Sequence, residues 1–173
     1  MDQEENKLKF FIEPLREEHD RAGFSCGVEP LDRYLHKQAT QDVKKHVAVV
    51  FILTPDGQTV AGFYTLSQYA VELDVIPKEI VKKLPKYPLV PATLLGRLAV
   101  GAMFRAQRLG ERLLMDALHR CFNASRQLAS AAVVVDAKDE GAAAFYKRYG
   151  FVELPKIAKR LFLPMGTIEK LFG

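Results

Sequence analysis

The sequence predicts an α/β protein built on a mixed β-sheet. Apolar runs of strand length, at 47–54 and 130–137, alternate with stretches whose apolar residues recur at helical spacing. A further apolar strand, 94–100, leads through the connector 101–110 directly into an amphipathic helix at about 110–124. Helices that cross between strands in this way are typical of a sheet covered by helices.

Length and composition favour one globular domain over residues 1–173, because 49% of the residues are hydrophobic. No apolar run approaches the roughly 20 residues of a membrane helix. The acidic, polar start MDQEENKLKF does not resemble a signal peptide, so we expect a cytoplasmic protein. Cys26 and Cys121 lack any CxxC or Cys/His clustering, which argues against a zinc site and favours free thiols. The net charge of +4 does not by itself indicate nucleic acid.

The N-terminal part predicts a strand, a loop and a helix. The strand at 9–14 ends in a proline, which cannot extend a ladder. Residues 15–28 form a loop, and its cluster Phe24-Ser25-Cys26-Gly27 is expected to fold inward. A helix starts at Glu29-Pro30, since proline suits the first turn, and continues to about Lys45. Its basic end, Lys44-Lys45-His46, is either a solvated face that complements the helix dipole or a ligand-binding surface.

The middle of the chain predicts a hairpin and a long excursion. The apolar run 47–54 is continuous, so we expect it to be buried on both sides. The sequence Pro-Asp-Gly-Gln at 55–58 is a turn, and the second strand follows at 59–69. Residues 72–91 are rich in proline and contain a short helix candidate at 78–84. Such long excursions often form binding surfaces.

The C-terminal part predicts further strands and helices. After the buried strand 130–137, residues 139–149 form an amphipathic helix with Gly150 as its C-cap. Two short strands, at 151–153 and 160–164, and a helix near 167–172 complete the chain.

The junction between strand 94–100 and the following helix is suited to binding phosphate. The N–H groups of a first helical turn have no intrahelical partners, and the helix dipole places partial positive charge there. Arg105 and Arg108 add formal charge at the same place.

Three segments resemble the general N-acetyltransferase (GNAT) superfamily: RLAV at 97–100, RAQRLG at 105–110 and AFYKRYGF at 144–151. The acetyl-CoA loop of that superfamily reads Arg/Gln-x-x-Gly-x-Gly/Ala. Arg105 and Gly110 match its first and last positions, whereas Arg108 replaces the middle glycine. The resemblance implies a GNAT fold, with a mixed, mostly antiparallel sheet of six to seven strands flanked by about four helices. It also implies acetyl-CoA as co-substrate and no metal.

Further segments are similar to the bacterial GNAT toxins of type II toxin–antitoxin pairs. These segments are FSCG at 24–27, LDRYL at 31–35, Gln38-Ala39, GFYTLS at 62–67, LGRLAV at 95–100 and FLPM at 162–165. The similarity implies acetylation of the α-amino group of aminoacyl-tRNA, which blocks translation. It also implies a homodimer that a ribbon-helix-helix antitoxin neutralises.

The chemistry of such a transfer requires few groups. An α-amine has a reference pKa of roughly 8, so no strong protein base is needed. Tyr146 matches the family's general acid, which would protonate the CoA sulfur. Its other interpretation is a core aromatic on an amphipathic helix. The Val100 N–H would polarise the thioester carbonyl. The residues expected to bind the cofactor are Leu98, Ala99, Val100, Arg105, Ala106, Gln107, Arg108, Leu109, Gly110 and Asp136, the last of which is alternatively a helix cap or a solvated residue.

A protein that holds tRNA needs a basic track toward the phosphates. The candidates are Arg97, Lys44, Lys45, Lys82, Lys83, Lys159 and Arg160, with His46, Lys86, Arg105 and Arg108 as further members. Two alternatives remain. One is a GNAT enzyme that acetylates a small amine or a protein N-terminus. The other is a non-catalytic GNAT-fold binding module, which Arg108 favours and Tyr146 disfavours.

Overall fold

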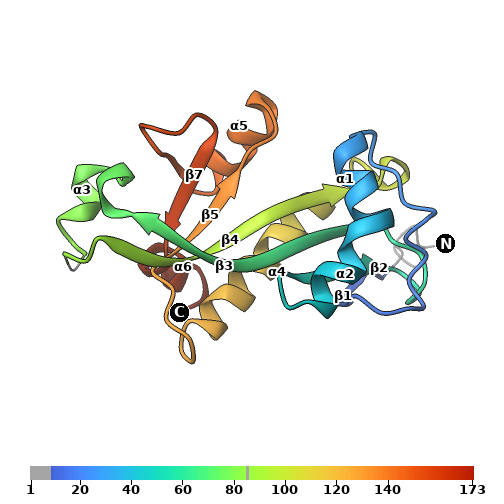
Figure 1. Cartoon of the computed structure of the whole chain (residues 1–173). Helices are drawn as coiled ribbons and strands as arrows, with labels where there is room; N and C mark the ends of the chain where they lie inside the picture. The colour runs from blue at the N-terminus through green and yellow to red at the C-terminus, as the bar shows by residue number, and fades with distance from the viewer. Residues whose placement is uncertain (1–8, 85) are drawn as a thin grey trace. The chain divides into compact units, whose positions relative to one another are not determined.

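The computed structural model describes residues 9–84 and 86–173, and Figure 1 shows the course of the chain. In these residues seven strands form one sheet with the hydrogen-bonded order β1-β2-β3-β4-β5-β7-β6. In chain order the elements are β1 (Phe11–Pro14), α1 (Glu29–Arg33), η1 (Tyr34–Gln38), α2 (Ala39–Lys44), β2 (Val49–Thr54), β3 (Gly62–Glu72), η2 (Leu73–Val75), α3 (Lys78–Val81), β4 (Leu89–Val100), η3 (Ala102–Phe104), α4 (Leu109–Ala124), β5 (Ala132–Asp136), α5 (Glu140–Arg148), β6 (Val152–Glu153), β7 (Arg160–Pro164) and α6 (Met165–Phe172).

The chain divides into two compact units, each of which is described by itself. Unit 1 comprises the chain up to Thr65 together with Arg97–Asp116. Unit 2 comprises Leu66–Gly96 and Ala117–Gly173. The mixed α/β fold that the sequence predicts is confirmed, while the assignment of residues 1–173 to a single domain stays a prediction.

The core of unit 1 forms around Phe63, which is fully buried on β3. The ring of Phe24 meets it edge-on at 5.5 Å between centroids, and the ring of Tyr34 stacks on it at 6.2 Å. Cys26 belongs to the same buried cluster. The expected inward fold of the Phe24–Gly27 segment is therefore confirmed for Phe24 and Cys26, whereas Ser25 and Gly27 are exposed.

The helix that starts at Glu29 differs from the regular helix expected through Lys45. Its middle turn, η1, is a π-helix between α1 and α2. The guanidinium of Arg21 points at this turn and donates to the Leu35 and His36 carbonyls at 3.5 and 3.4 Å. A wider turn keeps both Tyr34 and Leu35 buried in the core. Single π-turns within helices are frequent at functional sites.

Strand β2 is less completely covered than its apolar sequence predicts. Val50, Ile52 and Leu53 are buried, but Val49 is 49% exposed. The antiparallel pairing with β1 runs from Phe11–Thr54 to Pro14–Phe51, so Val49 lies beyond the last β1 pair. The expectation of burial on both sides is wrong at this end of the strand.

Unit 2 contains the mixed part of the sheet. Strand β4 pairs parallel to β5 from Thr93–Val133 to Leu95–Val135, and β5 pairs antiparallel to β7 along its whole length. The two-residue strand β6 pairs antiparallel to β7. Strand β4 begins at Leu89 rather than near residue 94, and α3 ends at Val81 rather than near residue 84.

Helix α5 begins and ends with specific caps. The Asp139 side chain accepts the Ala142 N–H at 2.8 Å, as an N-cap does. At the other end Gly150 has a φ of 96°, its N–H donates to the Lys147 carbonyl, and the Phe151 N–H donates to the Tyr146 carbonyl. This pair of bonds is a Schellman motif, and it confirms Gly150 as the glycine that ends the helix.

Among the described residues, no helix combines the length and the apolar character needed to cross a membrane.

Candidate active site

The loop between β4 and α4 contains two non-glycine residues with a left-handed backbone. Ala106 and Arg108 adopt left-handed φ angles of 66° and 56°. Arg108 precedes α4, and its carbonyl accepts the Arg112 N–H at 3.2 Å. A side chain in this conformation costs roughly 1–2 kcal/mol per residue, a cost that glycine at the position of Arg108 would avoid. Arg105, Ala106, Gln107 and Arg108 are all exposed and accessible to a ligand.

The end of β4 is closely packed against the start of β3 in unit 1. A Cβ atom on Gly62 would lie only 2.8 Å from the Ala99 carbonyl oxygen, so only glycine permits this approach. The Gly101 N–H donates to the Ala61 carbonyl at 2.7 Å. These contacts fix the backbone on either side of Val100, whose N–H is the predicted thioester donor.

The guanidinium of Arg105 points away from the loop between β4 and α4 and contacts the segment before α1. Its Nη2 donates to the Cys26 carbonyl at 2.6 Å, in the segment before α1. The backbone of Arg105 is extended, with φ −66° and ψ 162°. The loop sequence predicted this arginine as a cofactor residue, whereas the structure places its charge against the N-terminal segment.

Arg97 stacks on an aromatic ring in unit 1. Its guanidinium carbon lies 3.5 Å from the centroid of the Tyr34 ring, a cation–π arrangement. The Tyr34 hydroxyl donates to Asp42 Oδ2 at 2.9 Å. Burial, followed by this hydrogen bond, raises the pKa of Tyr34 to about 12. Arg97 has no carboxylate partner among the described residues, so its N–H groups remain available to an anion.

Tyr146 in unit 2 combines a buried ring with a protonated hydroxyl. It is 7% exposed, and its ring contacts Phe145 and Phe151 at 5.2 and 5.4 Å between centroids. Burial raises the pKa of the phenol above its ordinary value. The hydroxyl therefore keeps its proton throughout the physiological range. It has no hydrogen-bond partner within the described residues, so it can donate to a ligand.

Asp136 and Arg160 form an ion pair in unit 2. The guanidinium donates to both carboxylate oxygens, at 2.7 Å to Oδ1 and 3.0 Å to Oδ2, and also to the Tyr69 hydroxyl. The bond to Asp136 raises the pKa of Arg160. Both residues were predicted to contact ligands, as cofactor and tRNA contacts respectively, but here they contact each other. Their positions directly opposite on β5 and β7 could have indicated this pairing once the register was known.

The predicted lysines fall on separate parts of the chain. Lys44 and Lys45 are exposed at the end of α2 in unit 1. Lys82 and Lys83 are exposed just after α3 in unit 2, and Lys159 precedes β7 with a φ of 60°. Within the described residues, no group of three or more His, Cys, Asp or Glu is arranged to hold a metal ion.

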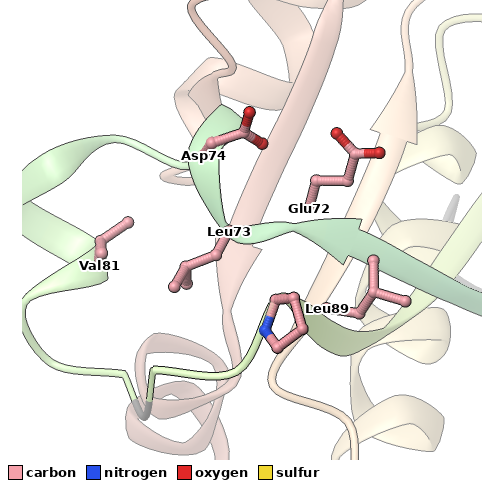
Figure 2. Close-up of a pocket in the computed structure, with 6 residues that line it drawn as sticks. Glu72, Leu73, Asp74, Val81 and Leu89 are labelled. Atoms are coloured by element: carbon pink, nitrogen blue, oxygen red, sulfur yellow. The ribbon is translucent and has the colours of Figure 1, made fainter.

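The excursion between β3 and β4 contains a pocket of about 530 Å³ in unit 2. Figure 2 shows the carboxylates of Glu72 and Asp74 on one side of the ribbon and the side chain of Leu73 on the other. Val81, Pro88 and Leu89 complete the lining, and Asp74 also pairs with Lys156 at 3.7 Å. None of the predicted site residues lines this pocket, and its two carboxylates do not suit phosphate.

The mixed sheet and the left-handed loop that leads from β4 into α4 agree with the acyltransferase fold that the sequence predicts. The profile of the Acetyltransferase (GNAT) family matches residues 12–151. The chain belongs to this family and is an acetyl-CoA-dependent acetyltransferase.

The chain is similar to toxins that act on tRNA. It is 34% identical to the tRNA-acetylating toxin of Mycobacterium tuberculosis, over 89% of this chain and 91% of the relative. The structure of AtaT complexed with acetyl-methionyl-tRNAfMet matches with a TM-score of 0.88 and 30% identity, over 95% of this chain and 100% of that chain. The structure of AtaTR bound with AcCoA matches with a TM-score of 0.84 and 29% identity, over 95% and 98% of the two chains.

Proposed function

We propose that this protein transfers the acetyl group of acetyl-CoA to the α-amino group of an aminoacyl-tRNA, and that it acts as a toxin by blocking translation. The observation that carries the proposal is the match over nearly the full chain to AtaT, a protein whose structure contains acetyl-methionyl-tRNA. A match of this length includes the N-terminal segment and the C-terminal strands as well as the acetyl-CoA loop.

The loop from Arg105 to Gly110 fits the pyrophosphate of acetyl-CoA. Its residues are exposed, and two left-handed residues redirect the backbone immediately before α4. The first N–H groups of this 16-residue helix complete an anion-binding terminus. We assign Leu98, Ala99 and Val100 on β4 to the remainder of the coenzyme.

The coenzyme supplies an activated acetyl group as a thioester. The neutral α-amine attacks the carbonyl carbon, a C–N bond forms, and the C–S bond breaks. The Val100 N–H is assigned to hold the carbonyl oxygen while negative charge develops on it. Tyr146 gives its phenolic proton to the departing thiolate, and the proton lost from the amine passes to solvent. Because burial keeps the pKa of Tyr146 high, the phenol is in its acid form at cellular pH.

We assign the binding of the acceptor tRNA to basic residues. Arg97 offers its unpaired guanidinium to a tRNA phosphate, and Lys44, Lys45, Lys82 and Lys83 provide exposed charge. Lys159 and Arg160 are the weaker candidates, because Arg160 already pairs with Asp136. Asp136 is likewise the weakest of the assigned cofactor residues.

The proposed function also implies a protein partner, an oligomeric state and a cellular location. Relatives of this chain bind an antitoxin, AtaR, and aminoacyl-tRNA. We propose a ribbon-helix-helix antitoxin as the partner of this chain, a homodimer as its active state, a single domain over residues 1–173 and a cytoplasmic location, where charged tRNA occurs.

The test is acetyl transfer in vitro from labelled acetyl-CoA to a set of charged tRNAs. We expect a labelled N-acetyl-aminoacyl product with at least one tRNA and none with uncharged tRNA. Polyamines and peptides with free N-termini are the competing acceptors. Efficient acetylation of one of these, with charged tRNA left unmodified, would overturn the proposal. Binding of acetyl-CoA without turnover on any acceptor would favour a non-catalytic module.

A further inference from the structure

The N-terminal loop, Phe24–Gly27, is bonded mainly by groups from outside it. The Cys26 N–H donates to Asp32 Oδ1 at 2.8 Å, on α1. The Ser25 carbonyl accepts the Ala102 N–H at 2.8 Å, and the Cys26 carbonyl accepts Arg105 Nη2 at 2.6 Å. The loop is therefore held by hydrogen bonds to α1 on one side and to the segment that follows β4 on the other.

The packing of the loop is as specific as its hydrogen bonds. Gly27 has a φ of 84°, and a Cβ atom there would lie 3.1 Å from Arg105 Nη2. A Cβ atom on Gly101 would lie 3.6 Å from the ring of Phe24 and 3.2 Å from the Ala61 carbonyl oxygen. Glycine at positions 27 and 101 thus lets the loop and the guanidinium approach the end of β4. In Figure 1 the tip of the β4 arrow lies beside α1, in agreement with these contacts.

This arrangement places the N-terminal loop one residue from the assigned carbonyl donor. Ala102 and Gly101 directly follow Val100, and Ala102 is itself bonded to the loop. The Ser25 side chain is exposed, and its hydroxyl lies 3.5 Å from Asp32 Oδ2. If Val100 holds the thioester carbonyl as proposed, the acceptor amine has to approach the same carbonyl, and the N-terminal loop lies next to that position.

We propose that Arg105 and Asp32 are positioning residues that hold the N-terminal loop beside Val100, and that the loop forms part of the binding surface for the aminoacyl end of the acceptor. Arg105 then helps to bind the acceptor through the N-terminal loop. Its position in the acetyl-CoA loop sequence would instead suggest that it binds the pyrophosphate of the coenzyme. The inference rests on the proposed function for its substrate, and on the hydrogen bonds of Arg105 and Asp32 for its geometry.

The test compares acceptor and coenzyme parameters in Arg105→Ala, Arg105→Lys and Asp32→Ala. Displacing the loop by about 1 Å can lower kcat/KM for aminoacyl-tRNA by about 100-fold, so we expect a loss of 10- to 100-fold in both alanine variants. The Kd of acetyl-CoA, measured by calorimetry, should change by less than about twofold, because the loop N–H groups and Arg108 remain. Arg105→Lys should recover part of the activity, since a lysine ammonium group can still donate to the Cys26 carbonyl. The double alanine variant should lose less than the product of the two single losses, because both changes release the same loop.

Arg126→Ala is the matched control. Arg126 is exposed and lies over the Phe122 ring in unit 2, so its removal takes away one positive charge without touching the N-terminal loop. If Arg105→Ala weakens acetyl-CoA binding tenfold and leaves the KM for tRNA unchanged, Arg105 is a phosphate ligand and the inference is wrong. If Arg126→Ala lowers kcat/KM for aminoacyl-tRNA as much as Arg105→Ala does, the effect comes from the lost charge alone, and the inference is likewise wrong.

Hydrogen exchange separates this inference from the proposed function. Without any substrate, residues 24–28 should exchange faster in Arg105→Ala and Asp32→Ala than in the wild-type protein, because the loop is no longer held. Unchanged hydrogen exchange in both variants would show that Arg105 and Asp32 do not hold the N-terminal loop, and it would overturn the inference. Absence of turnover by the wild-type protein on every charged tRNA would instead overturn the function and leave the exchange result standing.

Discussion

Arg108→Gly tests the backbone of the acetyl-CoA loop with a single change. Arg108 occupies the position at which the family loop carries glycine, and its φ of 56° lies in the left-handed region. The substitution restores the family residue without changing the backbone. It also removes an exposed guanidinium that has no ion-pair partner in the described part of the chain. Stability and ligand affinity should therefore change in opposite directions.

The stability change follows from two opposing terms. The left-handed conformation costs a non-glycine residue roughly 1–2 kcal/mol, which glycine avoids. Glycine loses more conformational freedom on folding, at a cost of roughly 0.5–1 kcal/mol. The difference is a net stabilisation of about 0.7 kcal/mol. In a protein of this size about 1 kcal/mol corresponds to roughly 2–4 °C in Tm, so we expect a rise of about 1–3 °C.

The control makes the same substitution where the backbone is right-handed. Arg148→Gly, in the last turn of α5, also removes one exposed positive charge. Glycine in a helix costs about 1 kcal/mol, so the Tm should fall by about 2–4 °C. Differential scanning calorimetry of the two variants therefore gives opposite signs. An equal fall in both would refute the argument from the φ of Arg108.

The affinity of Arg108→Gly for acetyl-CoA provides the second measurement. We expect the guanidinium to pair with the pyrophosphate, and an exposed charge-assisted hydrogen bond contributes about 1.5 kcal/mol. Its loss should weaken binding by about tenfold in isothermal titration calorimetry. Tighter binding in the glycine variant would show that the side chain crowds the coenzyme instead.

Three other residues give sharp expectations. Tyr146→Phe should lower kcat by about 10²- to 10⁴-fold with an unchanged Tm, because it removes the proton donor and keeps the buried ring; retained turnover would make Tyr146 a packing residue only. The Gln58 and Thr59 N–H groups lower the pKa of Asp56 to about 2 in the folded protein, so its contribution to stability is complete above about pH 4 and is lost as the pH falls toward 2. Asp56→Asn should flatten the dependence of Tm on pH in that window, and an unchanged profile would contradict this assignment. Asp136→Asn should lower the Tm slightly through the Arg160 pair and leave the Kd of acetyl-CoA almost unchanged, because Asp136 is the weakest of the assigned cofactor residues; a tenfold weaker Kd would show that its carboxylate contacts the coenzyme directly.

The elements that the sequence predicts well have strong local signals. Asp139 and Gly150 bound α5 because an N-cap and a left-handed C′ glycine act over a single turn. The junction of β4 and α4 was predictable for the same reason, since an apolar strand runs directly into an amphipathic helix. The family resemblance then assigned this junction to acetyl-CoA.

The features that the sequence does not predict depend on contacts between distant segments. The π-turn η1 follows from the fit of Tyr34 and Leu35 into the core and from Arg21, which lies well before the helix. The bond from Arg105 to the Cys26 carbonyl joins residues 79 positions apart. Helical periodicity and loop motifs contain no information about either contact, because both are set by tertiary packing.

The arginines of this protein illustrate why a charge in a motif does not identify its ligand. Arg105 donates to a carbonyl and Arg160 to a carboxylate, so both are engaged before any substrate binds. Arg97 is held on the Tyr34 ring, which fixes its direction but leaves its N–H groups unpaired in the described residues. Arg108 is exposed beside the first turn of α4. We therefore expect unit 1 to bind phosphate mainly through backbone N–H groups, and we propose that Arg108 contacts the coenzyme and Arg97 the acceptor.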